Sequence, residues 1–220
     1  MKKLFLLTAL ILVFSQAYSQ DTLTRKGYIG LDVINSLPSV ILPKQYYIRN
    51  TIIIEPYYLL DLPRPNRRLV LGTGFAHGST HQHFGFDPSQ HFKGAYFRAA
   101  HEIKKIRNPR KMLRIGYGPV FAIAGYQGKF RFDGPTFGDY EGDFKETNNV
   151  ALGIEAYFGQ DFKIGDNWLL RFTVRNVMGR RTNADTYVQY FPGFGFTPNG
   201  FNNRFLYSGG LSLQIHYNVR

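Results

Sequence analysis

The sequence contains no cysteine among its 220 residues. The chain therefore forms no disulfide bond, offers no thiolate to a metal ion, and has no cysteine on which a lipoprotein anchor could be built. Tryptophan (one residue) and methionine (three) are scarce, whereas phenylalanine (20) and tyrosine (15) are abundant. Large rings, rather than sulfur-containing side chains, must supply much of the apolar surface.

Long apolar runs are also scarce. The one sustained run, Leu4 to Phe14, has eleven residues, well short of the roughly 20 that a membrane-spanning helix needs. It follows Lys2 and Lys3 and precedes the small-x-small segment Ala17-Tyr18-Ser19, which is the three-part pattern of a secretory signal peptide. We predict a signal peptide over residues 1–20 and one exported domain over residues 21–220, which must use strands if it crosses a membrane.

Acidic residues are few relative to basic ones. The chain has 15 Asp and Glu against 27 Lys and Arg, for a formal net charge of +12. A basic protein of this size is a candidate for nucleic-acid binding, but an export signal argues against that partner. Anionic lipid head groups are the more natural counter-charge for an exported chain.

The end of the chain shows the clearest regular pattern, an alternation of apolar and polar residues. From Phe205 to Val219 one face carries Phe, Tyr, Gly, Leu, Leu, Ile, Tyr and Val, and the other carries mainly Ser, Gly, Gln, His and Asn. A period of two indicates a β-strand. Rings at both ends and aliphatic residues between them are typical of a strand that faces lipid on one side and a polar interior on the other.

Seven further segments show the same alternation. The connections after the second, fourth and sixth segments are short (60–67, 104–111 and 164–166), whereas the others run about 13 to 25 residues, as in 128–149 and 179–203. Alternating short and long connections are typical of outer-membrane barrels, with tight turns in the periplasm and long loops outside. We therefore predict an all-β fold, an eight-stranded antiparallel up-and-down transmembrane β-barrel with both termini periplasmic, whose strands are 27–34, 48–59, 68–77, 92–103, 112–126, 150–163, 167–178 and 205–219.

In this layout the chain resembles the small bacterial outer-membrane barrels of the OmpA and OmpX type. The resemblance covers residues 27–220 and includes the terminal strand Leu211 to Val219, although this chain ends on Val219-Arg220 rather than on an aromatic residue. It implies location in the outer membrane, contact with outer-membrane lipids and lipopolysaccharide, and insertion by the barrel-assembly machinery. It implies no nucleic-acid partner.

The alternation also predicts which charges face the interior. Buried charges persist when they are paired, so a balanced inward set indicates a network of salt bridges. Counting across the two short hairpins predicts three cross-strand neighbours, namely Glu155 with Arg175, Asp161 with Arg171, and Glu102 with Arg114. The inward set is Arg68, Arg98, Arg114, Arg171 and Arg175 against Asp32, Glu55, Glu102, Glu155 and Asp161.

An eight-stranded barrel is just wide enough for its own side chains to fill the interior. We therefore predict a closed lumen and no general diffusion pore. Four glycines, at positions 72, 74, 116 and 118, are predicted to face inward. Because they have no side chains, we expect local space beside them that water or a small solute would occupy.

Residues with catalytic or ligating chemistry do not form a convincing set. His77, His81, His83 and His91 surround one loop and have imidazole ligands for a divalent metal, but a solvated loop explains them equally well. His77 with Ser79 lacks the sequence signatures of outer-membrane hydrolases, and His101 and Glu102 point to opposite faces of one strand. We predict no catalytic residue, no metal and no cofactor.

The last long connection is unusually rich in aromatic rings. Exposed apolar rings mark a site for an apolar ligand or a protein partner, whereas rings that extend the interfacial girdle or fold over the barrel mouth as a lid need no partner. The lid or girdle is the favoured interpretation. The rings in question are Tyr187, Tyr190, Phe191, Phe194, Phe196 and Phe201.

The function expected from the sequence is non-enzymatic. An integral outer-membrane protein with a closed, salt-bridged lumen would act through its extracellular loops in envelope integrity, adhesion or partner binding. Two alternatives stay open: a channel or transporter for a small solute or an apolar ligand, and a lipid-modifying hydrolase of the outer leaflet.

Overall fold

A computed structural model describes most of the chain after the predicted signal peptide, which lies outside the described residues. The described residues are 26–35, 48–80, 90–108, 111–132, 134, 136, 138, 140–183, 188–196 and 204–219.

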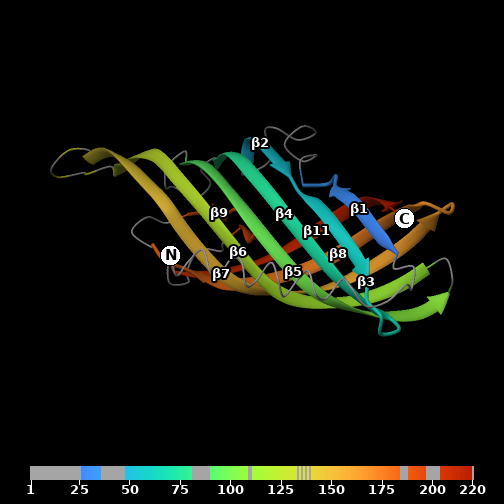
Figure 1. The fold of residues 1–220 in the computed structure, drawn as a ribbon. Coiled ribbons are helices and arrows are strands. Elements are labelled where there is room, and N and C mark those ends of the chain that lie inside the picture. Colours follow the sequence, from blue (N-terminus) through green and yellow to red (C-terminus); the bar gives the residue numbers. More distant parts are fainter. Residues whose placement is uncertain are drawn as a thin grey trace, which may run out of the picture.

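Nine strands form one closed antiparallel sheet (Figure 1). From β3 to β8 each wall strand pairs with the next along the chain, and β8 pairs with β11. β1 closes the ring between β3 and β11, and β2 pairs with β4. Because β2 and β3 together make one side of the wall, the fold is the predicted eight-stranded up-and-down barrel. The wall strands are β1 (Gly27–Asp32), β2 (Ile48–Ile54), β3 (Pro56–Asp61), β4 (Arg67–Thr80), β5 (Gln90–Asn108), β6 (Lys111–Phe132), β7 (Tyr140–Ile164), β8 (Trp168–Arg181) and β11 (Phe205–Val219).

The single segment predicted over 48–59 is interrupted at Glu55, between β2 and β3. Pro56 follows, and a proline has no N–H to donate to a neighbouring strand. The two parts differ in their neighbours, since β3 pairs with both β1 and β4 whereas β2 pairs with β4. The carbonyl oxygen of Glu55 accepts a 3.0 Å hydrogen bond from the backbone N–H of Asp32.

Two predicted connections were wrong in extent. Residues 128–149 are largely strand, because β6 continues to Phe132 and β7 begins at Tyr140, with a register shift between Ala124 and Tyr126. Residues 104–111 are also mostly strand, since β5 continues to Asn108 and β6 begins at Lys111. The predicted strand boundaries were placed where the apolar alternation ends. Backbone pairing continues beyond that point along both hairpins, so the strands are longer than predicted.

The outer face of the barrel carries a belt of exposed apolar side chains. Ile115 is 45% exposed, Phe158 60% and Leu211 52%, in agreement with the facing predicted from the alternation. Near the short-turn end, the rings of Trp168 and Tyr217 meet edge to face with centroids 5.1 Å apart, as expected for an interfacial girdle. The outer surface is therefore suited to a hydrocarbon environment.

The described residues include no helix that is both long and apolar enough to span a membrane.

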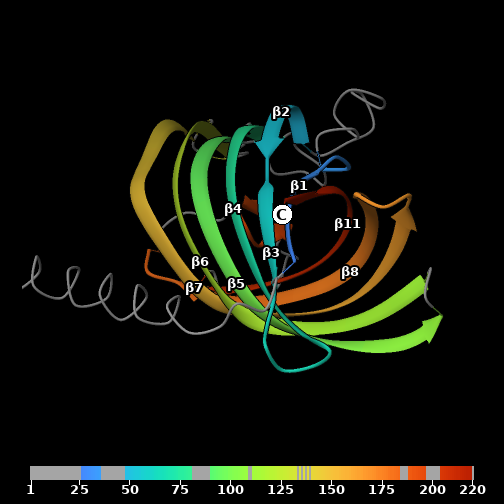
Figure 2. The same ribbon diagram turned by 45° about the vertical axis from the view of Figure 1, so that its right-hand side comes forward.

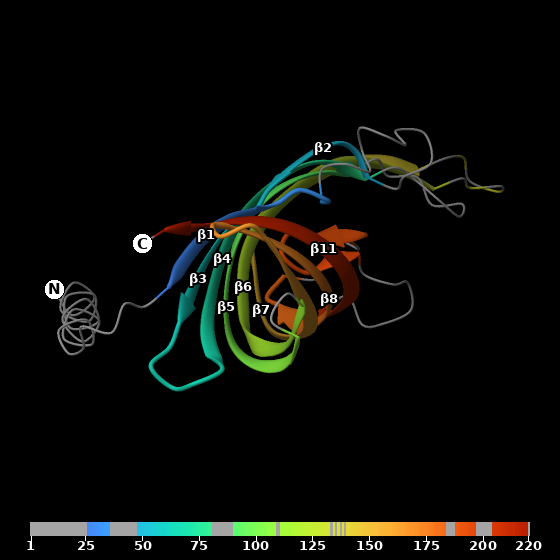
Figure 3. The ribbon, with the colours of Figure 1, turned by 90° about the vertical axis from the view of Figure 1, so that its right-hand side faces the viewer.

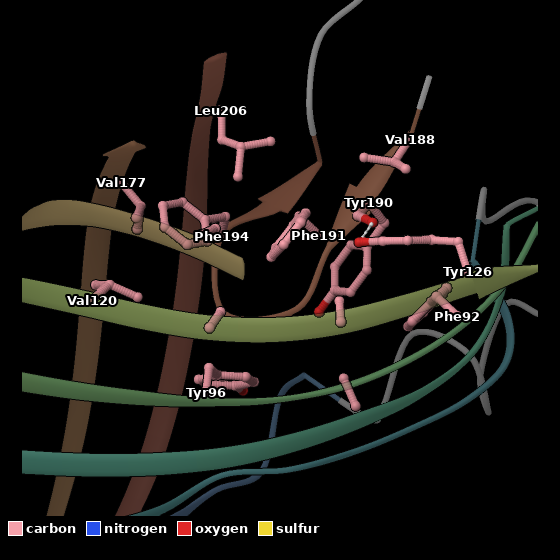
Figure 4. Packing of buried hydrophobic residues seen from close by; sticks show 14 of the residues in the cluster. Phe92, Tyr96, Val120, Tyr126, Val177, Val188, Tyr190, Phe191, Phe194 and Leu206 are labelled. Carbon is pink, nitrogen blue, oxygen red and sulfur yellow. Dashed lines mark hydrogen bonds between the residues drawn. The ribbon is translucent and has the colours of Figure 1, made fainter. Parts of the chain in front are cut away.

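A short hairpin from the connection between β8 and β11 lies inside the barrel, at the barrel end opposite the short turns. It consists of β9 (Tyr190–Phe191) and β10 (Gly195–Phe196), which pair with each other. Figure 4 shows Phe191 and Phe194 lying among wall residues such as Val120 and Leu206, and both rings are almost fully buried. This hairpin and the surrounding strands form the larger apolar cluster of the protein.

A second apolar cluster lies nearer the short turns. It is built around Leu59, Met112, Tyr157 and Leu169, which come from four different parts of the wall. Inward Tyr28 and Tyr57 also belong to it. Figure 3 shows the wall strands curving around this shared interior.

The space predicted at the inward glycines is occupied by the protein itself. A Cβ atom at Gly74 would lie 2.0 Å from the ring of Tyr96, and one at Gly116 would lie 2.2 Å from the ring of Tyr157. At Gly72 the neighbours are Arg98 and Tyr57, and at Gly118 they are backbone atoms of β5. Those four glycines therefore admit neighbouring groups rather than solute, which corrects the sequence-based expectation.

Candidate functional site

Charged side chains fill the barrel interior as two separate clusters. The turn-side cluster contains Arg68, Arg114 and Arg171 with Asp61, Glu102 and Asp161. The loop-side cluster contains Arg98 and Arg175 with Asp32, Glu55 and Glu155.

The turn-side cluster is balanced and centred on Asp161. Arg171 donates to Asp161 from Nε at 2.7 Å and to Glu102 from Nη1 at 2.7 Å. Arg114 also donates to Asp161, and Arg68 reaches the same carboxylate at 3.5 Å. Three guanidinium groups thus share one fully buried carboxylate, which is the condition under which buried charges are tolerated.

The loop-side cluster has one more carboxylate than guanidinium groups. Arg98 donates to Glu155 at 2.7 Å and lies 3.2 Å from Glu55, while Arg175 contacts Glu55 at 3.1 Å and Asp32 at 3.3 Å. Formal charges of three minus and two plus leave this cluster at −1. Two neutral donors compensate: Tyr57 donates to Glu55, and the Asn35 amide donates to Asp32 and Glu55 at 2.9 and 3.0 Å.

The predicted inward charges all lie in these clusters, but only some of the predicted pairs form. Asp161 lies opposite Arg171 across β7 and β8, as predicted. Glu102 lies 3.7 Å from Arg114, although the residue opposite it on β6 is Gly116. The Asp161–Arg171 pair agrees with the sequence-based prediction, whereas Glu102 and Arg114 are neighbours without lying opposite each other, because the register of that hairpin differs by two residues from the predicted one.

The third predicted pair was wrong. Tyr157, rather than Glu155, lies opposite Arg175, because the register that pairs Asp161 with Arg171 places Glu155 opposite Val177. Glu155 pairs with Arg98 of β5 instead. Arg175 reaches across the lumen to the carboxylates of β1 and of the segment between β2 and β3, a contact that neighbouring-strand counting does not consider.

Sequence reasoning also missed several polar participants. Tyr157 donates a 2.9 Å hydrogen bond to Glu102, and Asp61 pairs with Arg68 at 2.6 Å. Arg181 lies 3.8 Å from Glu146 beside the register shift. Tyr57 and Tyr157 each lie two residues after an inward carboxylate, Glu55 and Glu155, so their inward parity was available as a signal in the sequence.

Arg98 joins the inserted hairpin to the loop-side cluster. Its Nη2 donates a 3.1 Å hydrogen bond to the carbonyl oxygen of Gly193, in the turn between β9 and β10. Nearby, the Tyr126 hydroxyl donates to the carbonyl oxygen of Tyr190 at 3.1 Å. Gly193 has a φ of +80°, a left-handed conformation that a residue without Cβ adopts without strain. The turn is therefore held against the wall by side chains of β5 and β6.

The aromatic connection has its described rings inside the barrel. Tyr190, Phe191 and Phe194 are all buried, and the ring of Phe194 fills the space over Gly153 and Gly179. In this conformation these three rings do not form an exposed surface for a protein partner, and they match the favoured interpretation of a fold over the mouth. Tyr187, Phe201 and the side chain of Phe196 lie outside the described residues.

A cavity of about 580 Å³ lies between the inserted hairpin and the loop-side cluster. Its inner lining includes Tyr96, Arg98 and Arg175, and the hairpin contributes Tyr190 and Phe194. Closer to the short turns, the space between the two charged clusters is only about 10 Å³, about the room of one water molecule. The larger of these two cavities is the candidate binding site among the described residues.

Of the four candidate metal-ligating histidines, His77 and His91 do not line this cavity. His77 and His91 are on β4 and β5, where the residues opposite them are Lys93 and Ser79. His81 and His83 lie outside the described residues. Within the described ranges, no three His, Asp or Glu side chains are grouped so as to hold a metal ion. His101 lies beside the Tyr117 ring, with centroids 5.9 Å apart.

The fold and its interior define a class: a closed antiparallel β-barrel with an apolar outer belt and an ion-paired lumen. No family model matches the chain, and no curated protein matches it. Among solved structures, the chain is similar to the Neisserial surface protein A (NspA), with 11% sequence identity and a TM-score of 0.42, over 88% of this chain and 94% of that one.

Proposed function

We propose that this chain is an integral protein of the bacterial outer membrane whose lumen is closed, and that it acts without catalysis through its extracellular loops, in envelope integrity, adhesion or partner binding. The observation that carries the proposal is the division of the wall into an apolar outer belt and an ion-paired interior. Backbone groups in hydrocarbon must be hydrogen-bonded internally, and a closed barrel meets that requirement.

The proposed orientation places the short turns and both chain ends in the periplasm. The turn-side cluster then lies toward the periplasm, and the inserted hairpin lies toward the outside. Outer-membrane lipids and lipopolysaccharide are the proposed surroundings, and the barrel-assembly machinery the proposed route of insertion.

Fractionation of cells expressing the full chain tests the proposed location. The protein is expected in the outer-membrane fraction, and its unboiled form is expected to migrate differently from its boiled form on a denaturing gel. Recovery in a soluble fraction, without a heat-modifiable band, would overturn the proposal.

Planar-bilayer recording tests the closed lumen separately. The two charged clusters and the inserted hairpin support a barrel without steady conductance. A stable open channel from the purified protein would favour the channel alternative. For the hydrolase alternative, a lipid mass shift that depends on expression of this protein would be the decisive finding.

A further inference from the structure

Two cations lie on the outward face of the barrel wall near the short turns. Arg67 is the first residue of β4, and Lys105 is an exposed residue of β5. Arg67 lies opposite Ile103, so Lys105 is its diagonal neighbour on the same face. Figure 2 shows β4, β5 and β6 side by side in the wall. Because Ile103 is 44% exposed and belongs to the apolar outer belt, these cations lie at the edge of a surface that otherwise suits hydrocarbon.

Neither cation has a carboxylate partner among the described residues. The outward positions of β4, β5 and β6 hold no Asp or Glu in their described parts. Asp61 and Glu102, which lie nearby in the strand pairing, are paired with inward arginines. The undescribed residues between β5 and β6 are a proline and an arginine, which add no acid. A cation on a lipid-facing wall is costly unless an anion such as a lipid head group neutralises it.

His101 adds a third polar group to this face. It lies on the other side of Ile103 from Lys105, and its Nε2 is 3.4 Å from Nη1 of Arg67, which is long for a protein hydrogen bond. Its Nδ1 is buried and has no hydrogen-bond partner among the described residues. A proton on Nδ1 would therefore be a buried donor without an acceptor, which is costly. With the proton on Nε2, the imidazole and the guanidinium group are two donors side by side.

An exposed ring adjoins these donors. Tyr117 lies opposite His101 on β6 and is 56% exposed, and the two ring centroids are 5.9 Å apart. Tyrosine is enriched at the level of the head groups, where its ring meets acyl chains and its hydroxyl meets polar groups. A molecule that suits this place combines an anion for the donors with an apolar part for Tyr117 and Ile103.

We propose that Arg67, His101 and Lys105 bind the phosphate of an anionic phospholipid in the inner leaflet. The acyl chains of this lipid run over Tyr117 and Ile103. Guanidinium groups bind phosphate oxygens through paired hydrogen bonds, and the Nε2–H of the imidazole donates to the same phosphate. An ethanolamine head would bring its own ammonium group toward Lys105, so the site favours a head without one, as in phosphatidylglycerol. The proposal adds a lipid site to the proposed function and rests on the membrane location and orientation proposed there.

A tryptophan at position 117 reports which lipid occupies the site. The natural protein has a single tryptophan, Trp168, on the outward face of β8, which serves as the remote reporter. Tyr117→Trp combined with Trp168→Phe moves the reporter to the site. In vesicles of phosphatidylcholine and phosphatidylglycerol, with one lipid or the other brominated in its acyl chains, fluorescence quenching gives the relative affinity of the two lipids at each position.

Phosphatidylglycerol is expected to be favoured by at least about fivefold at position 117, and little or not at all at Trp168. Arg67→Gln should lower the preference at position 117 about fivefold, and His101→Phe, which keeps a ring there, should also lower it. Arg180→Gln, at an exposed arginine near the other end of the barrel, is the control and should leave it unchanged. Equal preferences at the two positions, or a preference that survives Arg67→Gln or His101→Phe, overturn the site.

Inorganic phosphate separates a lipid head group from a soluble anion as the occupant. Replacing chloride with inorganic phosphate at constant ionic strength should leave the preference for phosphatidylglycerol unchanged, because a soluble anion has no acyl chains to hold it against the wall. Loss of the preference under these conditions overturns the lipid as the occupant.

Thermal stability gives a second readout that needs no new tryptophan. A lipid that binds the folded barrel stabilises it, so the unboiled gel band of the natural protein should convert at a higher temperature in vesicles with phosphatidylglycerol than in phosphatidylcholine alone. Arg67→Gln should remove this difference, and Arg180→Gln should keep it. No difference in the natural protein overturns the proposal. A heat-modifiable barrel that fails these tests leaves the proposed function standing, whereas a chain that does not insert into vesicles overturns both.

Discussion

Arg98 of β5 donates a hydrogen bond to the backbone carbonyl of Gly193, 95 residues away in the chain. This contact links the hairpin inside the barrel to the charged cluster of the wall, since the same guanidinium group also holds Glu155 and lies beside Glu55. The hairpin and the loop-side cluster are therefore expected to respond together when either is changed.

Arg98→Met tests this coupling. The substitution removes the guanidinium group that pairs with Glu155, leaves Glu55 with Arg175 alone of its two guanidinium neighbours, and removes the Gly193 contact. Breaking a buried pair by removing one partner costs about 3–5 kcal/mol, so the urea midpoint for unfolding should fall strongly. Added protease should also cleave near residues 188–196 more readily than in the natural protein. Unchanged cleavage with a lowered midpoint would contradict the coupling.

Asp161 and Asp61 offer a matched comparison within the turn-side cluster. Both carboxylates contact Arg68, but the Asp61 side chain is 38% exposed and that of Asp161 is fully buried. Asp161→Asn should cost about 3–5 kcal/mol of folding free energy because three guanidinium groups lose their shared anion. Asp61→Asn should cost at most about 1 kcal/mol, as for a solvent-screened pair. Equal losses in urea unfolding would show that Asp161 is not the centre of the cluster.

Gly116 and Gly159 separate a filled position from an open one. A Cβ at Gly116 would lie 2.2 Å from the Tyr157 ring, whereas a Cβ at Gly159 has its nearest neighbour at 3.5 Å. Gly116→Ala should therefore destabilise the barrel by about 1–3 kcal/mol through overpacking, and Gly159→Ala should be nearly neutral. Thermal conversion of the unboiled gel band is the measurement, and comparable losses in both variants would refute the assignment.

A charge on the belt tests the membrane-facing surface. Ile115→Arg places a cation on the outward face of β6, and Arg near the bilayer midplane costs about 2–4 kcal/mol in such barrels. Tyr140→Arg, at the 66% exposed start of β7, lies in the hairpin extension and should change stability little. Unfolding from lipid vesicles in urea measures both variants, and a harmless Ile115→Arg would place this face outside hydrocarbon.

Shortening the inserted segment tests what closes the lumen. Replacing residues 184–203 with a short Gly-Ser linker removes the hairpin, including the Gly193 contact of Arg98, and keeps every charged residue of both clusters. Because the space between the clusters is only about 10 Å³, we expect no steady conductance in planar bilayers. A stable channel in this variant alone would assign closure to the hairpin rather than to the ion pairs.

The sequence determined the strands and their facing. Alternation from Phe205 to Val219 matched β11 at both ends, because each side chain of a wall strand meets either hydrocarbon or the lumen and the period of two records that choice. For the same reason, every charge predicted to face inward lies in one of the two clusters.

Only the tertiary structure decided which groups meet across the lumen. Arg175 reaches Glu55 and Asp32, 120 and 143 residues away, and Arg98 reaches Glu155 rather than a neighbour on its own hairpin. A closed barrel brings opposite walls together by its curvature and register, and local alternation carries no information on either. The same closure buries Tyr190, Phe191 and Phe194 inside the barrel. The sequence alone was compatible with two arrangements of these rings, an exposed binding surface or a lid over the barrel mouth.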